Sequence, residues 1–411
     1  MVRALRPVLL LLPVAVPAVV LRLTGTHPPA LASILVFGLA VVAASFVLAW
    51  AAEAAEVDIS GGLAIALLAI IAVLPEYAVD LYFAHKAGSN PDYVQYAAAN
   101  MTGSNRLLLG LGWSSVVLIS LYVASRRTGV SIRELVLESG YRRELGFLAI
   151  AGVVAFVIPV TGEIHLLLGI ALLGFFAYYL YRAAVSGHDD DPDLIGPSAR
   201  IGGLPTRQRR IAVIGMFVVS AGIILASAEP FADSLVEGGQ ALGIDQFLLV
   251  QWLAPLASEA PEFIIAILFA WRGKGAAALG LLISAKVNQW TLLIGSLPIA
   301  YGLGGGPAAL HLDGRQIEEF LLTATQTLLG IAVLLSLRFP RWAAWTLLAL
   351  FAIQFAVPGQ TGRYILSAIY LVLAIIATTR NRHHLAATLR APFRKPAVPT
   401  PADRTPDLVD A

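Results

Sequence analysis

Two stretches of the chain decide its fold. Residues 69–88 read AIIAVLPEYAVDLYFAHKAG, and residues 252–275 read WLAPLASEAPEFIIAILFAWRGKG. Each contains a Pro-Glu pair, Pro75-Glu76 or Pro261-Glu262, inside a long apolar run. Proline removes a backbone donor and frees a carbonyl one turn earlier, and a freed carbonyl is too costly in hydrocarbon unless it faces protein, water or a cation. The two stretches therefore predict broken membrane helices around a polar site.

A second apolar helix follows each Pro-Glu helix. Residues 96–113 read YAAANMTGSNRLLLGLGW, and residues 279–295 read LGLLISAKVNQWTLLIG, so small and polar residues interrupt both. With an odd number of spans between them, the two copies run in opposite directions through the membrane. Inverted repeats with a site at their interface are typical of secondary transporters.

The composition excludes a soluble domain. Of the 411 residues, 58% are hydrophobic and only 13% are charged, with a mean hydropathy of +0.78. A soluble domain usually carries about a quarter charged residues. The absence of cysteine excludes disulfides, Fe–S clusters and thiol chemistry. The net charge of +2 gives no indication of nucleic-acid binding.

Apolar runs long enough to cross the membrane recur along the whole chain. They predict an all-α polytopic membrane protein with about twelve transmembrane helices, arranged as two inverted five-helix repeats plus one extra helix at each end. The predicted spans are 6–23, 29–54, 62–85, 93–123, 145–161, 164–184, 210–229, 246–271, 275–301, 317–337, 341–357 and 363–379. The first could also be a cleaved signal peptide, because it begins with Arg3 and Arg6.

These spans divide the chain into parts. The order is an extra N-terminal helix in 1–28, a first half in 29–185, a cytoplasmic linker in 186–209, a second half in 210–357, an extra C-terminal helix in 358–392 and a disordered cytoplasmic tail in 393–411. The first α-repeat covers about 62–123 and the second about 246–301.

The basic residues sort by membrane side. With the N-terminus inside, 22 of the 28 Lys and Arg residues fall in inner segments and four fall outside. Such an excess of bases marks the cytoplasmic side, so both termini are predicted to be cytoplasmic. The abundance of alanine and of arginine over lysine is typical of a bacterial protein, which predicts the bacterial inner (plasma) membrane.

Ionisable and amide groups inside the spans are the candidate site, because such groups are costly there unless they are functional or paired. Glu76 and Glu262 are the paired carboxylates of the two repeats, and we expect both to be needed for transport and to lie close together. The predicted cation ligands are Glu76, Glu262, Glu259, Ser104, Asn100, Asn105 and Ser258. Lys286, Arg106 and Asp80 are predicted to modulate charge or coupling, and Gln289 and Asn288 are possible ligands.

At these residues the chain resembles the sodium/calcium exchanger family of the cation/calcium exchanger superfamily. The first repeat matches that family's motifs in Leu74-Pro75-Glu76 and in Asn100, Gly103, Ser104 and Asn105, and the second matches in Pro261-Glu262, Ser258 and Gly280. The resemblance covers roughly 29–357. It implies two inverted five-helix halves and alternating-access antiport of Ca²⁺ or a related cation against Na⁺ or H⁺.

The chain also departs from the family pattern. The family's Thr-Ser is Ala72-Val73 in the first repeat, and its serine is Glu259 in the second. The family's G-S-N becomes Ser284-Ala285-Lys286. Fold and transporter class carry over, whereas the ion stoichiometry does not.

Lys286 is the departure with the largest electrostatic effect. At about 4 Å and an effective dielectric near 20, two unit charges interact by roughly 4 kcal/mol, and a divalent ion is repelled about twice as strongly. Glu259 or Glu262 could pair with Lys286, or Lys286 could point away from the cavity and anchor a helix. We expect weakened Ca²⁺ selectivity, with Na⁺ or H⁺ as at least one exchanged ion.

The leading prediction is therefore a secondary cation antiporter that is not an enzyme and needs no cofactor besides its transported cations. A Na⁺/H⁺ or K⁺/H⁺ antiporter on the same fold is one alternative, and an ion-binding, channel-like membrane protein is another. The chain has no H-E-x-x-H motif, nucleophile elbow or glycine-rich phosphate loop in or near a span, which argues against a membrane enzyme. Its expected partners are inorganic cations and the lipid bilayer, and the oligomeric state stays open.

Overall fold

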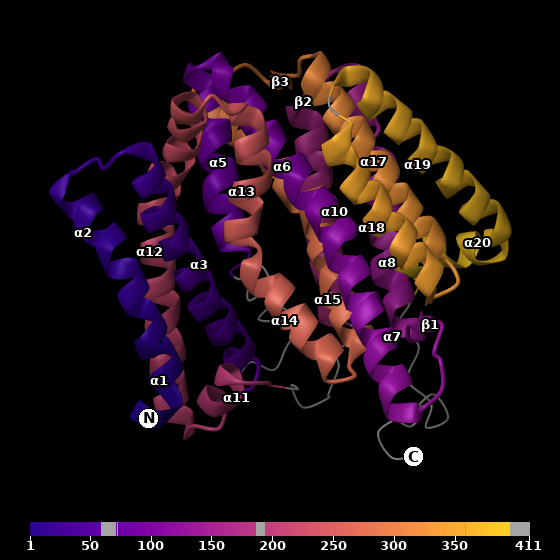
Figure 1. Ribbon diagram of the computed structural model, residues 1–411, viewed down its shortest axis with the longest axis horizontal. Coiled ribbons are helices and arrows are strands. Elements are labelled where there is room, and N and C mark those ends of the chain that lie inside the picture. Colours follow the sequence, from indigo (N-terminus) through magenta and orange to yellow (C-terminus); the bar gives the residue numbers. More distant parts are fainter. Residues whose placement is uncertain (59–70, 72, 186–193, 358, 395–411) are drawn as a thin grey trace.

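The computed structural model describes residues 1–58, 71, 73–185, 194–357 and 359–394. The described chain forms a bundle of long helices that run between two ends of the molecule, with short strands at both ends (Figure 1). The described residues leave out 62–70 and 72 of the predicted span 62–85, 186–193 of the predicted linker and 395–411 of the predicted tail.

The first half of the chain contributes the helices before residue 186. They are α1 (Val2–Leu11), η1 (Leu12–Ala15), α2 (Val16–Thr24), α3 (Ala30–Ala55), α5 (Leu74–Ser89), η2 (Pro91–Tyr93), α6 (Val94–Leu107), the π-helical η3 (Leu108–Trp113), α7 (Ser114–Thr128), η4 (Ser139–Tyr141), α8 (Arg142–Val154), α9 (Val157–Thr161) and α10 (Leu166–Val185).

The second half repeats much of this order. Its helices are α11 (Pro197–Gly202), α12 (Thr206–Leu242), α13 (Gln246–Ser258), α14 (Ala260–Trp271), α15 (Gly275–Asn288), the π-helical η5 (Gln289–Leu293), α16 (Ile294–Leu303), α17 (Gly314–Leu334), α18 (Arg341–Ala356), α19 (Gln360–Arg380), α20 (Arg382–Arg390) and η6 (Ala391–Phe393).

Nine helical segments of the described chain are long and apolar enough to span a membrane, and the bent pair α13–α14 makes a tenth. This agrees with the predicted all-α membrane class, while the predicted number of twelve is not confirmed. The two remaining predicted spans correspond to α5, whose beginning adjoins residues that are not described, and to α18, which has only 16 residues.

Two short antiparallel ladders tie the halves together. β1 (Glu134–Val136) pairs with β4 (Arg338–Pro340), and β2 (Glu163–His165) pairs with β3 (Ala309–His311). Each ladder joins a connection in the first half to one in the second. The ladders lie near opposite ends of the bundle (Figure 1).

Helices of the two repeats pack directly against each other. The helix α6 lies along α13, and α5 lies along α16. At Gly103 any added Cβ would overlap the backbone carbonyl of Gln251, so only glycine permits this approach of α6 to α13. The polar middle of the first repeat is thereby held against the broken helix of the second.

Candidate cation-binding site

The Pro-Glu pairs mark the helix breaks that were expected from the sequence. The helix α5 begins at Leu74, with Pro75 in its first turn, and α14 begins at Ala260, followed by Pro261. The α13 and α14 axes differ by 57°, and Glu259 is the residue between them. A proline suits the first turn of a helix because the backbone N–H that it lacks would have no intrahelical acceptor there. Each break leaves one carboxylate beside a helix start.

The centre of the site is a buried hydrogen-bonded group of four side chains from both repeats. Ser104 Oγ lies 2.6 Å from Glu76 Oε1 and also contacts Glu259 Oε1. The amide of Gln289 donates to Ser104 Oγ at 2.7 Å, to Glu259 Oε1 at 2.6 Å and to Glu76 Oε1 at 3.2 Å. All four residues are nearly inaccessible to solvent. A carboxylate from each half therefore meets at one hydroxyl and one amide.

This arrangement has a direct electrostatic consequence. Two ionised carboxylates in low dielectric repel each other strongly, so a proton or a cation between Glu76 and Glu259 is needed to stabilise the pair. The second oxygen of Glu259 and the oxygen of Gln289 are buried and accept no hydrogen bond from any described residue. Such unpaired oxygens are ligands that hard cations prefer.

A second polar layer lies one turn away. Asp80 follows Glu76 by four residues on α5, and Asn100 precedes Ser104 by four residues on α6. Both are completely buried; Asp80 interacts with Asn100 and with Glu76, and neither side chain has a hydrogen-bonding partner among the other described residues. Because α5 packs against α6 in the opposite direction, the two layers stack along one seam. Their oxygens extend the row of buried oxygens from Glu76 along α5.

The structure brings Glu259, rather than Glu262, into contact with Glu76. Glu262 is half-buried and makes no hydrogen bond or ion pair with a described residue, although it lies near enough to Glu76 and Glu259 to interact electrostatically. The hydroxyl of Ser258 donates to the carbonyl of Ala254 at 3.1 Å, within its own helix. In this conformation Glu262 and Ser258 thus lie beside the hydrogen-bonded group without joining it.

Lys286 is completely buried and contacts Asn105. Its Nζ donates to the backbone oxygen of Asn105 at 2.8 Å and to Oδ1 of the same residue at 2.9 Å. It forms no ion pair with Glu259 or Glu262, although Glu259 and Glu76 interact with it electrostatically. Of the alternatives considered for Lys286, an ion pair with Glu259 or Glu262 is not formed in this conformation, and Lys286 contacts the first repeat instead.

Two further predicted residues have structural partners. Arg106 forms a buried ion pair with Glu319 (2.6 Å) and donates to Gln354 Oε1 at 3.1 Å. Asn288 accepts a hydrogen bond from the hydroxyl of Tyr77 at 2.9 Å. Arg106 thus contacts α17 and α18 and not the four-residue group.

The sequence reasoning missed the partners of these residues. Glu319 lies early in a predicted span, where an ionisable side chain indicates a buried ion pair or a functional group. Its position in the sequence could therefore have identified it as a partner for a buried arginine. Tyr77 carries no such signal, because a tyrosine in an apolar helix is ordinary. Among the described residues no three Asp, Glu, His or Cys side chains gather as a metal-binding group. The site's oxygens therefore come from two carboxylates, a hydroxyl and amides.

Comparison with known proteins identifies the family. The sodium/calcium exchanger protein family matches residues 29–185 and 212–358. The crystal structure of the H⁺/Ca²⁺ exchanger CAX superposes with a TM-score of 0.88 at 41% identity, covering 95% of this chain and 98% of that chain.

More distant structures share the fold. Native YfkE has a TM-score of 0.61 at 17% identity, covering 89% of this chain and 99% of that one. The sodium-calcium exchanger NCX_Mj, soaked with 2.5 mM Na⁺ and 10 mM Sr²⁺, has a TM-score of 0.53 at 17% identity, covering 80% and 99%. No significant match occurs among curated proteins. The expected resemblance is thus confirmed, and the chain belongs to the sodium/calcium exchanger protein family, a family of membrane cation exchangers.

Proposed function

We propose that this protein exchanges Ca²⁺ against H⁺ across a bacterial inner membrane by alternating access. The observation that carries the proposal is the contact of Glu76 and Glu259 through Ser104 and Gln289, because these two carboxylates need either a cation or a proton between them. The similarity to a protein described as an H⁺/Ca²⁺ exchanger supports the same pair of ions.

Competition at one site explains obligatory exchange. When Ca²⁺ occupies the pair, both carboxylates are ionised and act as ligands. When the ion leaves, a proton takes its place and relieves the repulsion between the two carboxylates. Opening of the site to one side and then to the other therefore moves the two ions in opposite directions. The amide of Gln289 and the hydroxyl of Ser104 hold the two carboxylates at a constant separation during this change.

Na⁺/H⁺ exchange is the second candidate. Lys286 carries an ammonium group within electrostatic range of both carboxylates, and a divalent ion is repelled about twice as strongly as a monovalent one. In either case Asp80, Asn100 and Asn105 are proposed to line the path, and Glu262 and Ser258 to join the ligands in another conformation. The proposed topology places both termini in the cytoplasm.

Flux into proteoliposomes tests the proposal. Vesicles with an acidic interior should accumulate radioactive Ca²⁺, and an internal pH dye should report alkalinisation at the same time. A Glu76→Gln/Glu259→Gln protein, which keeps the size of both side chains, is the control. Uptake driven only by a Na⁺ gradient would favour the second candidate. Ca²⁺ uptake down its own gradient, with no counter-movement of H⁺ or Na⁺, would contradict exchange altogether.

A further inference from the structure

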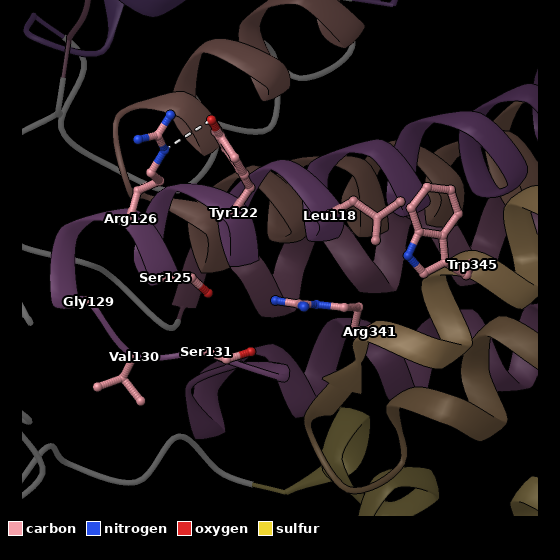
Figure 2. Close-up of a pocket in the computed structure, with 9 residues that line it drawn as sticks. All are labelled: Leu118, Tyr122, Ser125, Arg126, Gly129, Val130, Ser131, Arg341 and Trp345. Atoms are coloured by element: carbon pink, nitrogen blue, oxygen red, sulfur yellow. Dashed lines mark hydrogen bonds between the residues drawn. The ribbon is translucent and has the colours of Figure 1, made fainter.

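A pocket lies away from the cation site, between the end of α7, the segment that follows it and the start of α18. It encloses about 510 Å³ and is open on one side. It lies toward the end of the bundle at which α1 begins (Figure 1). Figure 2 shows Arg341 extending alongside α7 toward Ser125 and Ser131, with Arg126 and Tyr122 together near the end of the same helix.

The pocket carries two guanidinium groups without a carboxylate partner among the described residues. Arg126 donates its Nε to the hydroxyl of Tyr122 at 3.1 Å, and Arg341 donates one terminal nitrogen to the carbonyl of Ile132 at 2.7 Å. These contacts orient both groups without neutralising them. A guanidinium has five N–H donors, so both groups retain donors for an anion. The nearby Glu134 already forms an ion pair with Arg338.

The walls of the pocket are those of a membrane interface. Tyr122 is 49% exposed and Trp345 is 56% exposed, and Tyr122 also packs edge-on against the exposed Trp271. Tyrosine and tryptophan gather where hydrocarbon meets the lipid headgroups. The half-buried Leu118 continues the apolar wall along α7, away from the helix end. The pocket therefore offers positive charge at headgroup depth and an apolar wall at acyl-chain depth.

We propose that this pocket binds the phosphate of an anionic phospholipid in the inner leaflet. Arg341 contacts the phosphate oxygens, Arg126 adds positive charge at the mouth of the pocket, and the acyl chain lies against Leu118 and Trp345. The hydroxyl of Ser125 accepts from the backbone N–H of Ile132 at 2.9 Å, which leaves its proton free for the ligand. Zwitterionic phosphatidylcholine binds more weakly, because its choline group is repelled by the same two arginines. Soluble phosphate binds more weakly as well, because it gains nothing from the apolar wall.

Native mass spectrometry of the detergent-solubilised protein tests the proposal. The protein is titrated with phosphatidylglycerol, phosphatidylcholine or inorganic phosphate, and retained molecules are counted. We expect one phosphatidylglycerol to bind about tenfold more tightly to the unchanged protein than to the variant Arg126→Gln/Arg341→Gln, which corresponds to the loss of charge-assisted contacts.

The matched control is Arg207→Gln/Arg382→Gln, which removes two exposed arginines outside the pocket. It should retain the lipid as tightly as the unchanged protein does. Because Arg341 also contacts the loop before β1, the single variant Arg126→Gln is measured too. Its affinity for phosphatidylglycerol should fall between that of the unchanged protein and that of Arg126→Gln/Arg341→Gln. Equal retention by the pocket variant and the control would overturn the proposal. Equal retention of phosphatidylcholine, or displacement by inorganic phosphate at similar concentration, would overturn it as well.

Discussion

At Ser104 a single hydroxyl stands between two carboxylates that come from opposite halves of the chain. The hydroxyl carries one proton, so it donates to one carboxylate oxygen at a time, while the two N–H groups of Gln289 are available to the others. Glu76 and Glu259 are consequently held together without being neutralised. In the proposed exchange, this arrangement lets a cation or a proton bind at the same position.

Replacing either central carboxylate tests this reasoning. Glu76→Gln and Glu259→Gln should each lower Ca²⁺-driven exchange in proteoliposomes by at least about 100-fold, since even changes to the groups around metal ligands cost 10–100-fold in affinity. Glu262→Gln should reduce exchange less, because Glu262 lies outside the hydrogen-bonded group. The exposed Glu237→Gln is the control. An active Glu259→Gln protein together with an inactive Glu262→Gln protein would assign the site to Glu262.

Two substitutions of Lys286 distinguish the effect of its charge on Ca²⁺ affinity from the effect of its side-chain shape. Lys286→Gln keeps a donor for Asn105 and removes the ammonium group, so Ca²⁺ affinity should rise about tenfold and the pH dependence of exchange should flatten. Lys286→Arg keeps the charge and is the matched comparison, with affinity near that of the unchanged protein. Calorimetric titration with Ca²⁺ at several pH values provides the measurement. Unchanged affinity in Lys286→Gln would show that the ammonium group does not face the ion.

Among the helices, the contact of α6 with α13 depends on the absence of a side chain. Gly103→Ala should lower the free energy of unfolding by about 1–3 kcal/mol, as inserted carbon atoms do in a packed core, because its Cβ would overlap the carbonyl of Gln251. Gly215→Ala on α12 is the control, since an added Cβ there meets open space. Thermal unfolding in detergent compares the two. Equal stabilities of Gly103→Ala and Gly215→Ala would mean that α6 and α13 move apart to admit the added methyl group without a cost in free energy.

At the end of the bundle where α1 begins, Asp58 joins the end of α3 to α12. It accepts from Arg209 at 2.7 and 2.8 Å, and these hydrogen bonds hold the pKa of Asp58 below its usual value of 3.8. A lowered pKa in the folded state contributes stability that is complete above the usual value and is lost as the pH falls below it. Arg210 contacts the same carboxylate at 3.2 Å and adds to the effect.

Asp58→Asn should therefore be less stable than the unchanged protein at pH 7, and the difference should shrink as the pH is lowered below about 4. Melting temperatures of both proteins between pH 7 and pH 3 give this difference directly. Asp92→Asn, at an exposed aspartate near the opposite end of the bundle, should show no comparable trend. A difference that grows toward low pH would contradict the pairing.

For the whole molecule, Glu319 connects the first half to the C-terminal helices. It lies 2.6 Å from Arg106 of α6 and 3.2 Å from Arg363 of α19, and all three side chains are buried. Glu319→Gln removes the carboxylate that pairs with both buried arginines. We expect a loss of about 3–5 kcal/mol of stability, the usual effect of breaking a buried ion pair.

The neighbouring Glu318→Gln provides a close control, because Glu318 is buried on the same helix and forms no ion pair among the described residues. Size-exclusion profiles and thermal unfolding of the two variants distinguish them. If Glu319→Gln were as stable as Glu318→Gln, then the ion pairs of Glu319 would contribute nothing measurable to holding the C-terminal helices against the bundle.

Hydropathy and motif spacing determined the membrane class, the family and the positions of most helices. The spans predicted at 93–123 and 275–301 coincide with the helical segments Pro91–Thr128 and Gly275–Leu303. These properties are local: an apolar run partitions into lipid whatever its neighbours are, and a proline favours a helix start or a kink through its own backbone geometry.

Only the tertiary structure decided which polar groups meet. Successive residues on a helix point about 100° apart, so the bend at Glu259 turns that carboxylate toward Glu76 and leaves Glu262 beside it. The rotation of α15 against α6 likewise brings Lys286 to Asn105, and the packing of α17 brings Glu319 to Arg106. Such pairings depend on how helices distant in the sequence rotate and tilt against each other. The packing of the whole bundle sets that orientation, so no single segment of the sequence specifies it.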